Sequence, residues 1–247
     1  MKVVVSSKLK AKITLISTLV LIFAVLLTGF YLLIIKENAI DASISSNQNY
    51  TVIIDAGHGG IDGGTQAKDG TLEKNINLNI ALMIRDILRT YGVNTVLTRE
   101  TDISIHDNGV TGIRNQKISD INNRLNIIET TENALFVSIH QNYFSQTKYS
   151  GSQIFYSKNN PQSQQLALSI RNAITENLQK ENTREIKQSG SEIYLLKNAT
   201  APAVMVECGF LSNESEAELL KTEEYQKQIA FFIAYGIINH MNSAEVL

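Results

Sequence analysis

After residue 50 the chain alternates short apolar segments with longer amphipathic ones, and this pattern constrains the fold more than any other feature. Strands are predicted at 51–55, 93–99, 134–140, 152–157, 192–196 and 203–209. Helices are predicted between Thr71 and Gly92, and near 116–131, 161–179, 214–220 and 223–240. Such alternation is typical of a layered α/β domain with helices on both sheet faces. The strands lack regular polar–apolar alternation, which favours a mostly parallel, twisted sheet buried on both faces. We therefore predict a single three-layer domain at 50–242.

A second segment, at 13–35, is uncharged and mostly apolar. As a helix it would be roughly 35 Å long at about 1.5 Å per residue, enough to cross a hydrocarbon core of about 30 Å. Four lysines and no acid precede it, which places residues 1–12 in the cytoplasm and everything after the span outside. We expect a single-pass transmembrane anchor in the cytoplasmic membrane, followed by a polar linker at 36–49.

A cleaved secretory signal is the alternative for this segment. The apolar region of a signal peptide usually has only about 7–15 residues, which is shorter than the run here. Both interpretations place the folded domain outside the cytoplasm.

Charge and cysteine content exclude several classes of function. The first 36 residues carry five of the 22 basic side chains and no acid, so the remainder has 17 basic and 24 acidic side chains and a net charge of −7. An acidic domain is a poor candidate for binding nucleic acid. Cys208 is the only cysteine, so the chain has no internal disulfide and no thiolate cluster for a metal, and we expect it to be a packed core residue.

Three candidate residues fall at the ends of predicted strands. His58 follows the first strand in a glycine-rich turn, His140 ends the third, and Glu207 lies near the end of the last. In open α/β sheets, ligands bind at the carboxyl ends of the strands. Glu73, at the start of the first helix, is a fourth candidate, because a helix N-terminus stabilises an ionised carboxylate.

These residue types suit a hydrolytic zinc site, which needs three nitrogen or oxygen ligands, an open position for water and a carboxylate that accepts a proton. Each of the four candidate residues also has an interpretation without a metal. His58 could be a solvent-facing turn residue, Glu73 an ordinary first-turn acid, and His140 a rim residue of the sheet. Glu207 is costly inside the apolar run AVMVECGFL unless it is paired, protonated or bound to metal. It could act as a general base or pair with a buried arginine such as Arg124. His106 and His240 are expected to be exposed.

Together these motifs resemble the zinc-dependent N-acetylmuramoyl-L-alanine amidases of the amidase-3 family. The resemblance covers roughly 51–239 and is carried by IIDAGHGGIDGG, LEKNINLNIALMIRDIL, LFVSIHQN and APAVMVECGFLSNESEAELL. It implies one Zn²⁺ held by His58, Glu73 and His140, with Glu207 as the catalytic carboxylate. It also implies that Arg124 supports the site and that Asn142 contacts substrate. Family members usually have proline where this chain has Ala56, a change that affects turn stiffness rather than chemistry.

Within that family, the chain is similar to short membrane-anchored amidases of spore formers that trim cortex peptidoglycan. Some relatives block their zinc with a helix inserted after the third ligand, and the short segment after His140 leaves no room for one. The substrate implied is the amide bond between the muramic lactyl group and L-alanine of the stem peptide. The alternatives are a zinc peptidase that cuts within the stem peptide, or a non-catalytic wall-binding or regulatory module. A regulatory partner protein is a further expectation.

Overall fold

The computed structural model describes residues 16–18, 20–29 and 50–243. The chain separates into two compact units, 1–44 and 45–247. In the first unit, residues 16–18 and 20–29 are helical. Across the described residues, none of the helices combines the length and apolar character needed to span a membrane. The predicted anchor at 13–35 falls partly outside the described residues, and the cytoplasmic flank and the linker fall wholly outside them.

The second unit is built on one six-stranded sheet with the order β2-β1-β3-β6-β4-β5. Its strands are β1 (Thr51–Ala56), β2 (Asn94–Leu97), β3 (Ala134–Asn142), β4 (Gln153–Tyr156), β5 (Lys187–Gln188) and β6 (Ala203–Phe210). Strands β2, β1, β3 and β6 run parallel, whereas β4 is antiparallel to β6 and parallel to β5. The predicted mostly parallel sheet is confirmed.

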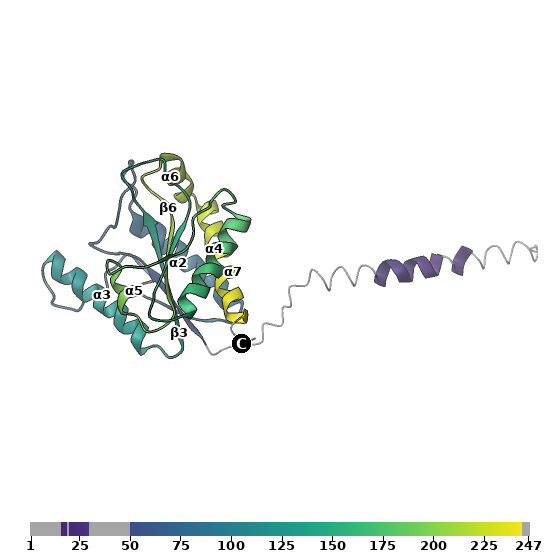
Figure 1. Ribbon diagram of the computed structural model, residues 1–247, viewed down its shortest axis with the longest axis horizontal. Coiled ribbons are helices and arrows are strands. Elements are labelled where there is room, and N and C mark those ends of the chain that lie inside the picture. Colours follow the sequence, from purple (N-terminus) through teal and green to yellow (C-terminus); the bar gives the residue numbers. More distant parts are fainter. Residues whose placement is uncertain (1–15, 19, 30–49, 244–247) are drawn as a thin grey trace, which may run out of the picture. The chain divides into compact units, whose positions relative to one another are not determined.

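Helices cover both faces of this sheet. The helices α2 (Glu73–Thr90), α4 (Gln162–Asn177) and α7 (Glu223–Ser243) pack together on one face, and α3 (Ile113–Thr130) and α5 (Tyr194–Asn198) lie on the other (Figure 1). The short helix α6 (Glu214–Leu220) follows β6. Successive residues of β1 enter different cores: Val52 and Ile54 pack under α2, whereas Ile53 joins the cluster beside α3. The three-layer prediction is therefore confirmed.

The prediction of a strand at 192–196 was wrong. Residues Tyr194–Asn198 form α5, and the edge strand is the two-residue β5 just before it. The adjacent residues Leu195 and Leu196 are both buried in the core cluster beside α3. Two neighbouring side chains can enter one core from a helix, whereas in a strand they would point to opposite faces.

Helix α2 begins and ends close to the predicted positions, but its N-terminus is not capped as predicted. Its N-cap is Leu72 and not Thr71, and no side chain caps it. At the other end Gly92 has φ +73°, and the amides of Gly92 and Val93 donate to Arg89 and Leu88. This is the paired hydrogen-bond pattern of a glycine C-terminal cap, which confirms the predicted stop.

Candidate metal centre and cleft

The turn after β1 holds His58 in an unusual backbone conformation. His58 has φ +62°, in the left-handed region that side chains other than glycine rarely adopt. Its carbonyl accepts a hydrogen bond of 2.7 Å from Arg124 Nη2. The carbonyls of Ala56 and Gly57 accept hydrogen bonds from Arg99 Nε and Nη2 at 2.9 and 3.1 Å. Two buried guanidinium groups therefore fix the backbone that presents the imidazole.

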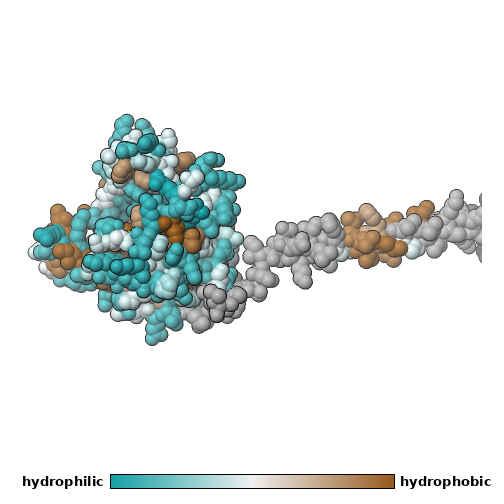
Figure 2. All heavy atoms as spheres, in the orientation of Figure 1, coloured by the Kyte–Doolittle hydropathy of each residue, from teal (hydrophilic) through white to brown (hydrophobic). Residues whose placement is uncertain are grey.

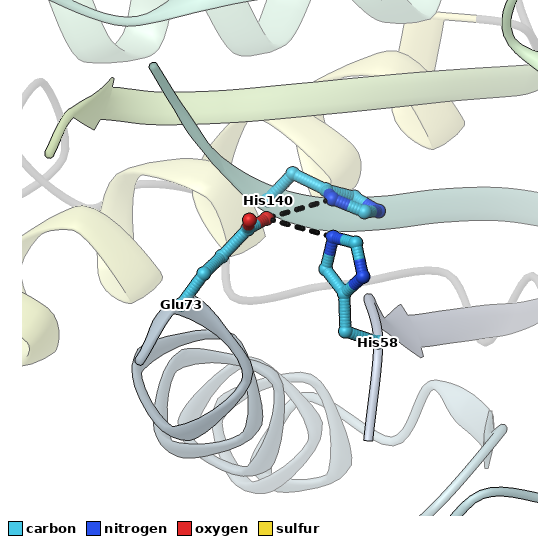
Figure 3. Close-up of side chains that lie close together, drawn as sticks. All are labelled: His58, Glu73 and His140. Atoms are coloured by element: carbon cyan, nitrogen blue, oxygen red, sulfur yellow. Dashed lines mark hydrogen bonds and ion pairs between the residues drawn. The ribbon is translucent and has the colours of Figure 1, made fainter. Parts of the chain in front are cut away.

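His58, Glu73 and His140 converge although they come from different elements (Figure 3). His58 Nε2 lies 3.3 Å from Glu73 Oε1, and His140 Nδ1 lies 2.9 Å from the same oxygen. One potential ligand atom from each residue lies within 4.8 Å of the other two. Ligands held 2.0–2.2 Å from one tetrahedral ion are roughly 3.3 Å apart, and two histidines with one glutamate form a known zinc set. The donor set fits a zinc ion.

Glu73 is the centre of this cluster. It is the first residue of α2 and is 3% exposed. Its Oε2 accepts from the Thr65 amide at 2.8 Å, and its Oε1 accepts from the Gln141 amide at 3.1 Å. Burial alone would raise the pKa of Glu73, but His140 and His58 outweigh it and lower the pKa. The carboxylate is thus ionised, as metal binding requires.

His58 is polarised by two carboxylates. Burial alone would lower the pKa of the imidazole, but the hydrogen bonds to Asp62 and Glu73 outweigh it and raise the pKa to about 9.

Close packing in the cluster requires glycine at two positions. A Cβ atom at Gly57 would lie 2.3 Å from His140 Nε2. A Cβ at Gly64, which has φ +69°, would lie 2.5 Å from Glu73 Oε2. The glycine-rich turn therefore lets the backbone approach the ligand side chains.

Glu207 lies beside the cluster on the neighbouring strand, where it is the register partner of His140 in the β3–β6 pair. Its Oε2 is buried and has no hydrogen-bond partner among the described residues. Burial raises the pKa of Glu207 to about 7. A carboxyl group with this pKa can both accept and release a proton near neutral pH.

The alternative that Glu207 pairs with Arg124 is wrong. Arg124 Nη1 instead bonds Asp55, which is 1% exposed, and Arg124 Nε donates to Asp120 Oδ2 at 2.7 Å. Burial alone would raise the pKa of Asp55, but Arg124 and a 2.6 Å hydrogen bond from Ser138 Oγ outweigh it and lower the pKa. Arg124 therefore lies beneath the His58 turn as a positioning residue.

Three further residues were singled out in the sequence, namely Asn142 and the other two histidines. Asn142 ends β3 and is half-buried, and its carbonyl accepts from the Leu211 amide at 2.8 Å. The predictions of exposure for the other two histidines were wrong. His240 is 3% exposed on α7, because its face of that helix packs against the core. His106 is half-buried, with Nδ1 2.9 Å from Ser104 Oγ.

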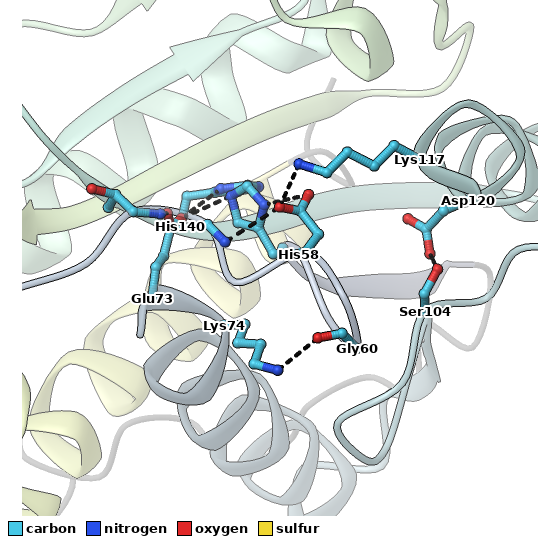
Figure 4. A network of polar contacts seen from close by, with 12 residues as sticks. His58, Gly60, Glu73, Lys74, Ser104, Lys117, Asp120 and His140 are labelled. Carbon is cyan, nitrogen blue, oxygen red and sulfur yellow. Dashed lines mark hydrogen bonds and ion pairs between the residues drawn. The ribbon is translucent and has the colours of Figure 1, made fainter. Parts of the chain in front are cut away.

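Sequence reasoning missed the polar network around the turn, which includes Asp62, Lys117 and Arg99. Figure 4 shows Lys117 reaching toward the turn that carries His58. Asp62 stands in the same glycine-rich block as His58, four residues later, and this short spacing was an available signal. Lys117 and Arg99 lie far along the chain, and only the fold brings them to the turn.

His58, His140 and Glu207 line a cleft of about 1060 Å³ between α3 and the segment around α5. Apolar side chains gather over α3 in Figure 2, and Ile61, Ile113 and Ile118 are exposed along the same cleft. Residues 143–152, all of which are described, contain no helix. The cleft thus opens onto the cluster, as a hydrolytic site for a large substrate requires.

Comparisons with known proteins agree with this architecture. The family model for N-acetylmuramoyl-L-alanine amidase, Amidase_3, matches residues 52–239. The germination-specific N-acetylmuramoyl-L-alanine amidase of Bacillus subtilis is 36% identical over 189 residues, which cover 76% of this chain and 78% of that protein.

Two solved structures share the fold. The CwlD amidase of Clostridioides difficile, solved in complex with the GerS lipoprotein, is 42% identical with a TM-score of 0.75, and the match covers 78% of this chain and 98% of that one. The amidase AmiC2 of Nostoc punctiforme is 30% identical with a TM-score of 0.65, with coverage of 78% and 98%. With its two-histidine, one-glutamate cluster in an open cleft, the chain belongs to the N-acetylmuramoyl-L-alanine amidase family Amidase_3.

Proposed function

We propose that this amidase is zinc-dependent and hydrolyses the amide between the muramic lactyl group and L-alanine of the peptidoglycan stem peptide. One zinc ion per chain would be held by His58, Glu73 and His140. The observation that carries the proposal is the convergence of these three donors beside Glu207, whose buried Oε2 has no hydrogen-bond partner in the described part of the chain. When bound, zinc supplies Lewis-acid polarisation of the carbonyl and lowers the pKa of water to about 7.

The protein's own groups perform the proton transfers. Glu207 in its ionised form accepts a proton from the attacking water and delivers it to the departing nitrogen of L-alanine. Glu73 is held by the amides of Thr65 and Gln141, and His58 is held by Asp62, so these two donors need little reorganisation. In this proposal the cleft receives the peptidoglycan, with the scissile amide beside Glu207.

The first test is the metal content of the purified full chain. We expect one zinc per chain by atomic emission analysis, and His58→Ala should lose both the zinc and the hydrolysis of peptidoglycan. His106→Ala is the matched control, because its imidazole belongs to a separate loop and should leave zinc content unchanged. A wild-type chain that binds no zinc, or a His58→Ala variant that retains it, would contradict the assigned ligands.

Product analysis identifies the bond. Mass analysis of digested peptidoglycan should show stem peptides with free L-alanine amino termini and intact glycan strands. Cuts within the stem peptide would instead indicate a zinc peptidase, and the absence of any product would indicate a binding module. Digestion of purified cortex and of vegetative wall in parallel tests our further proposal that cortex is the substrate, which the germination-specific relative supports.

We also propose that residues 13–35 anchor the chain in the cytoplasmic membrane with the amidase domain outside. The apolar run and the lysines before it support this orientation. The full chain should remain with membranes after carbonate extraction, and protease added to intact spheroplasts should degrade the domain. Recovery of an N-terminally shortened chain in the soluble fraction would favour the cleaved signal instead.

A regulatory partner is the last part of the proposal. The solved CwlD amidase is in complex with the GerS lipoprotein, which is a precedent within the family. Full hydrolysis of cortex by the purified, zinc-loaded chain alone would show that no partner is required.

A further inference from the structure

His58 makes a second polar contact on the side of the ring that faces away from the cluster. Its Nε2 faces Glu73, whereas its Nδ1 lies 2.9 Å from Asp62 Oδ2. A carboxylate oxygen can only accept, so Nδ1 carries the hydrogen in this contact. The imidazole that remains when a metal displaces the proton from Nε2 is therefore the tautomer with its hydrogen on Nδ1.

Hydrogen bonds fix both the backbone and the side chain of Asp62. Its backbone amide and carbonyl pair with the carbonyl and amide of Gly59 at 3.1 and 2.9 Å. Its Oδ1 accepts a 2.8 Å hydrogen bond from Lys117 Nζ (Figure 4). The two carboxylate oxygens thus have different partners. Oδ2 contacts the imidazole of His58, and Oδ1 accepts a hydrogen bond from Lys117 on α3.

Lys117 connects Asp62 to a distant part of the chain. It lies 55 residues from Asp62 along the chain and comes from α3, which forms one wall of the cleft. The side chains of His58 and Asp62 are 24% and 26% exposed, and that of Lys117 is 49% exposed. The Asp62 carboxylate is partly shielded from solvent, so water does not readily replace its hydrogen bond to the His58 ring.

We propose that Asp62 and Lys117 form a positioning pair that fixes the tautomer and ring orientation of His58 and thereby sets the zinc affinity of the cluster. This inference rests on the proposed function, in which His58 is a zinc ligand. Carboxylates bonded to the second nitrogen of a ligating imidazole orient it and raise its basicity, and their removal typically weakens metal binding by 10–100-fold. Neither residue touches the reacting bond in this scheme.

The main test is the zinc Kd of the full chain, measured by competition with a chromophoric chelator. Asp62→Ala should weaken zinc binding by about 10- to 100-fold. Asp62→Asn keeps an acceptor for Nδ1–H but loses the charge, so its Kd should lie between those of Asp62→Ala and wild type. The ¹⁵N shifts of the His58 ring provide a second readout: they should report a protonated Nδ1 in the zinc-bound wild type and a tautomer mixture in Asp62→Ala.

A double-mutant cycle tests the role of Lys117. Lys117→Met should weaken zinc binding severalfold in the wild-type background and add nothing in the Asp62→Ala background. Asp69 and Lys221 form a matched control pair, because they join the same loop to the end of α6 at 2.6 Å without touching His58. Asp69→Ala and Lys221→Met should leave the zinc Kd unchanged.

The outcomes separate this inference from the proposal on which it rests. A wild-type zinc Kd in Asp62→Ala, or additive effects of the two substitutions, would overturn the positioning pair while leaving the zinc site intact. Failure of the wild-type chain to bind zinc would overturn the proposed function itself. Circular dichroism of the chelated variants shows that a weakened Kd does not reflect unfolding.

Discussion

Glu207→Gln is expected to reduce hydrolysis of peptidoglycan by about 10²- to 10⁴-fold, the usual contribution of a positioned general acid–base group. The amide fills the same space but cannot accept the proton that the reaction moves. Zinc content should be unchanged, because the three proposed ligands are other residues. Single-turnover digestion of a muropeptide by the zinc-loaded chain measures the effect. Glu132→Gln, the same change at an exposed site, should have wild-type turnover.

Glu207→Gln should also stabilise the metal-free protein at high pH. The folded-state pKa of about 7 lies above the ordinary value of 4.5, so folding disfavours the ionised form of Glu207. This penalty is absent below pH 4.5, grows as the pH rises, and is complete above pH 7. A shift of this size corresponds to about 3 kcal/mol. Urea unfolding with chelator present should show Glu207→Gln more stable than wild type at pH 8 and equal to it at pH 4.

A variant that lost activity without gaining stability at pH 8 would contradict this account of Glu207. If Glu207→Gln kept a turnover rate within tenfold of wild type, Glu207 would not be the catalytic base. In the wild type, kcat/KM should fall as the pH drops through the pKa of Glu207, and that pKa lies at or below about 7 once a cation is bound nearby.

Arg124→Met is expected to destabilise the domain by about 3–5 kcal/mol, because it leaves the buried carboxylate of Asp55 without its cation. The carbonyls of Ala56 and His58 would also lose a donor. Zinc affinity should therefore fall together with stability. Equilibrium urea unfolding of the zinc-free chain measures the first effect, and chelator competition measures the second.

Two further variants make this prediction specific. Arg171→Met removes an arginine whose ion pair with Glu185 is exposed, so it should cost less than about 1 kcal/mol. The double variant Asp55→Asn with Arg124→Met should recover part of the lost stability, because it removes the unpaired buried charge. A cost below 1 kcal/mol for Arg124→Met would show that Asp55 does not depend on this guanidinium.

The sequence was informative where local periodicity and strand ends determine structure. The parallel strands, the helices α2, α4 and α7, and the positions of His58, His140 and Glu207 at strand ends followed from apolar patterning and topology. Residues 192–196 were misassigned because a short apolar run fits a strand and a buried helical turn equally well. Only packing beside α3 distinguishes them.

The charged contacts around the turn could not be predicted from residue types alone. Arg124 was recognised as a supporting residue by resemblance, but its pairing with Asp55 depends on how α3 crosses the end of β1. Its other partner, Asp120, lies four residues earlier on the same helix, a spacing that the sequence did offer. The same crossing brings Lys117 to Asp62. Such pairs are set by three-dimensional geometry, and many pairings of opposite charge would fit the sequence equally well.

The strand order gives the cluster one more property. The donors follow β1, begin α2 and lie on β3, and the assigned base is on β6, so no short fragment of the chain contains the whole set. The zinc binding that we propose would therefore follow the pairing of the central parallel strands. The chain would have no amidase activity until its tertiary structure is complete.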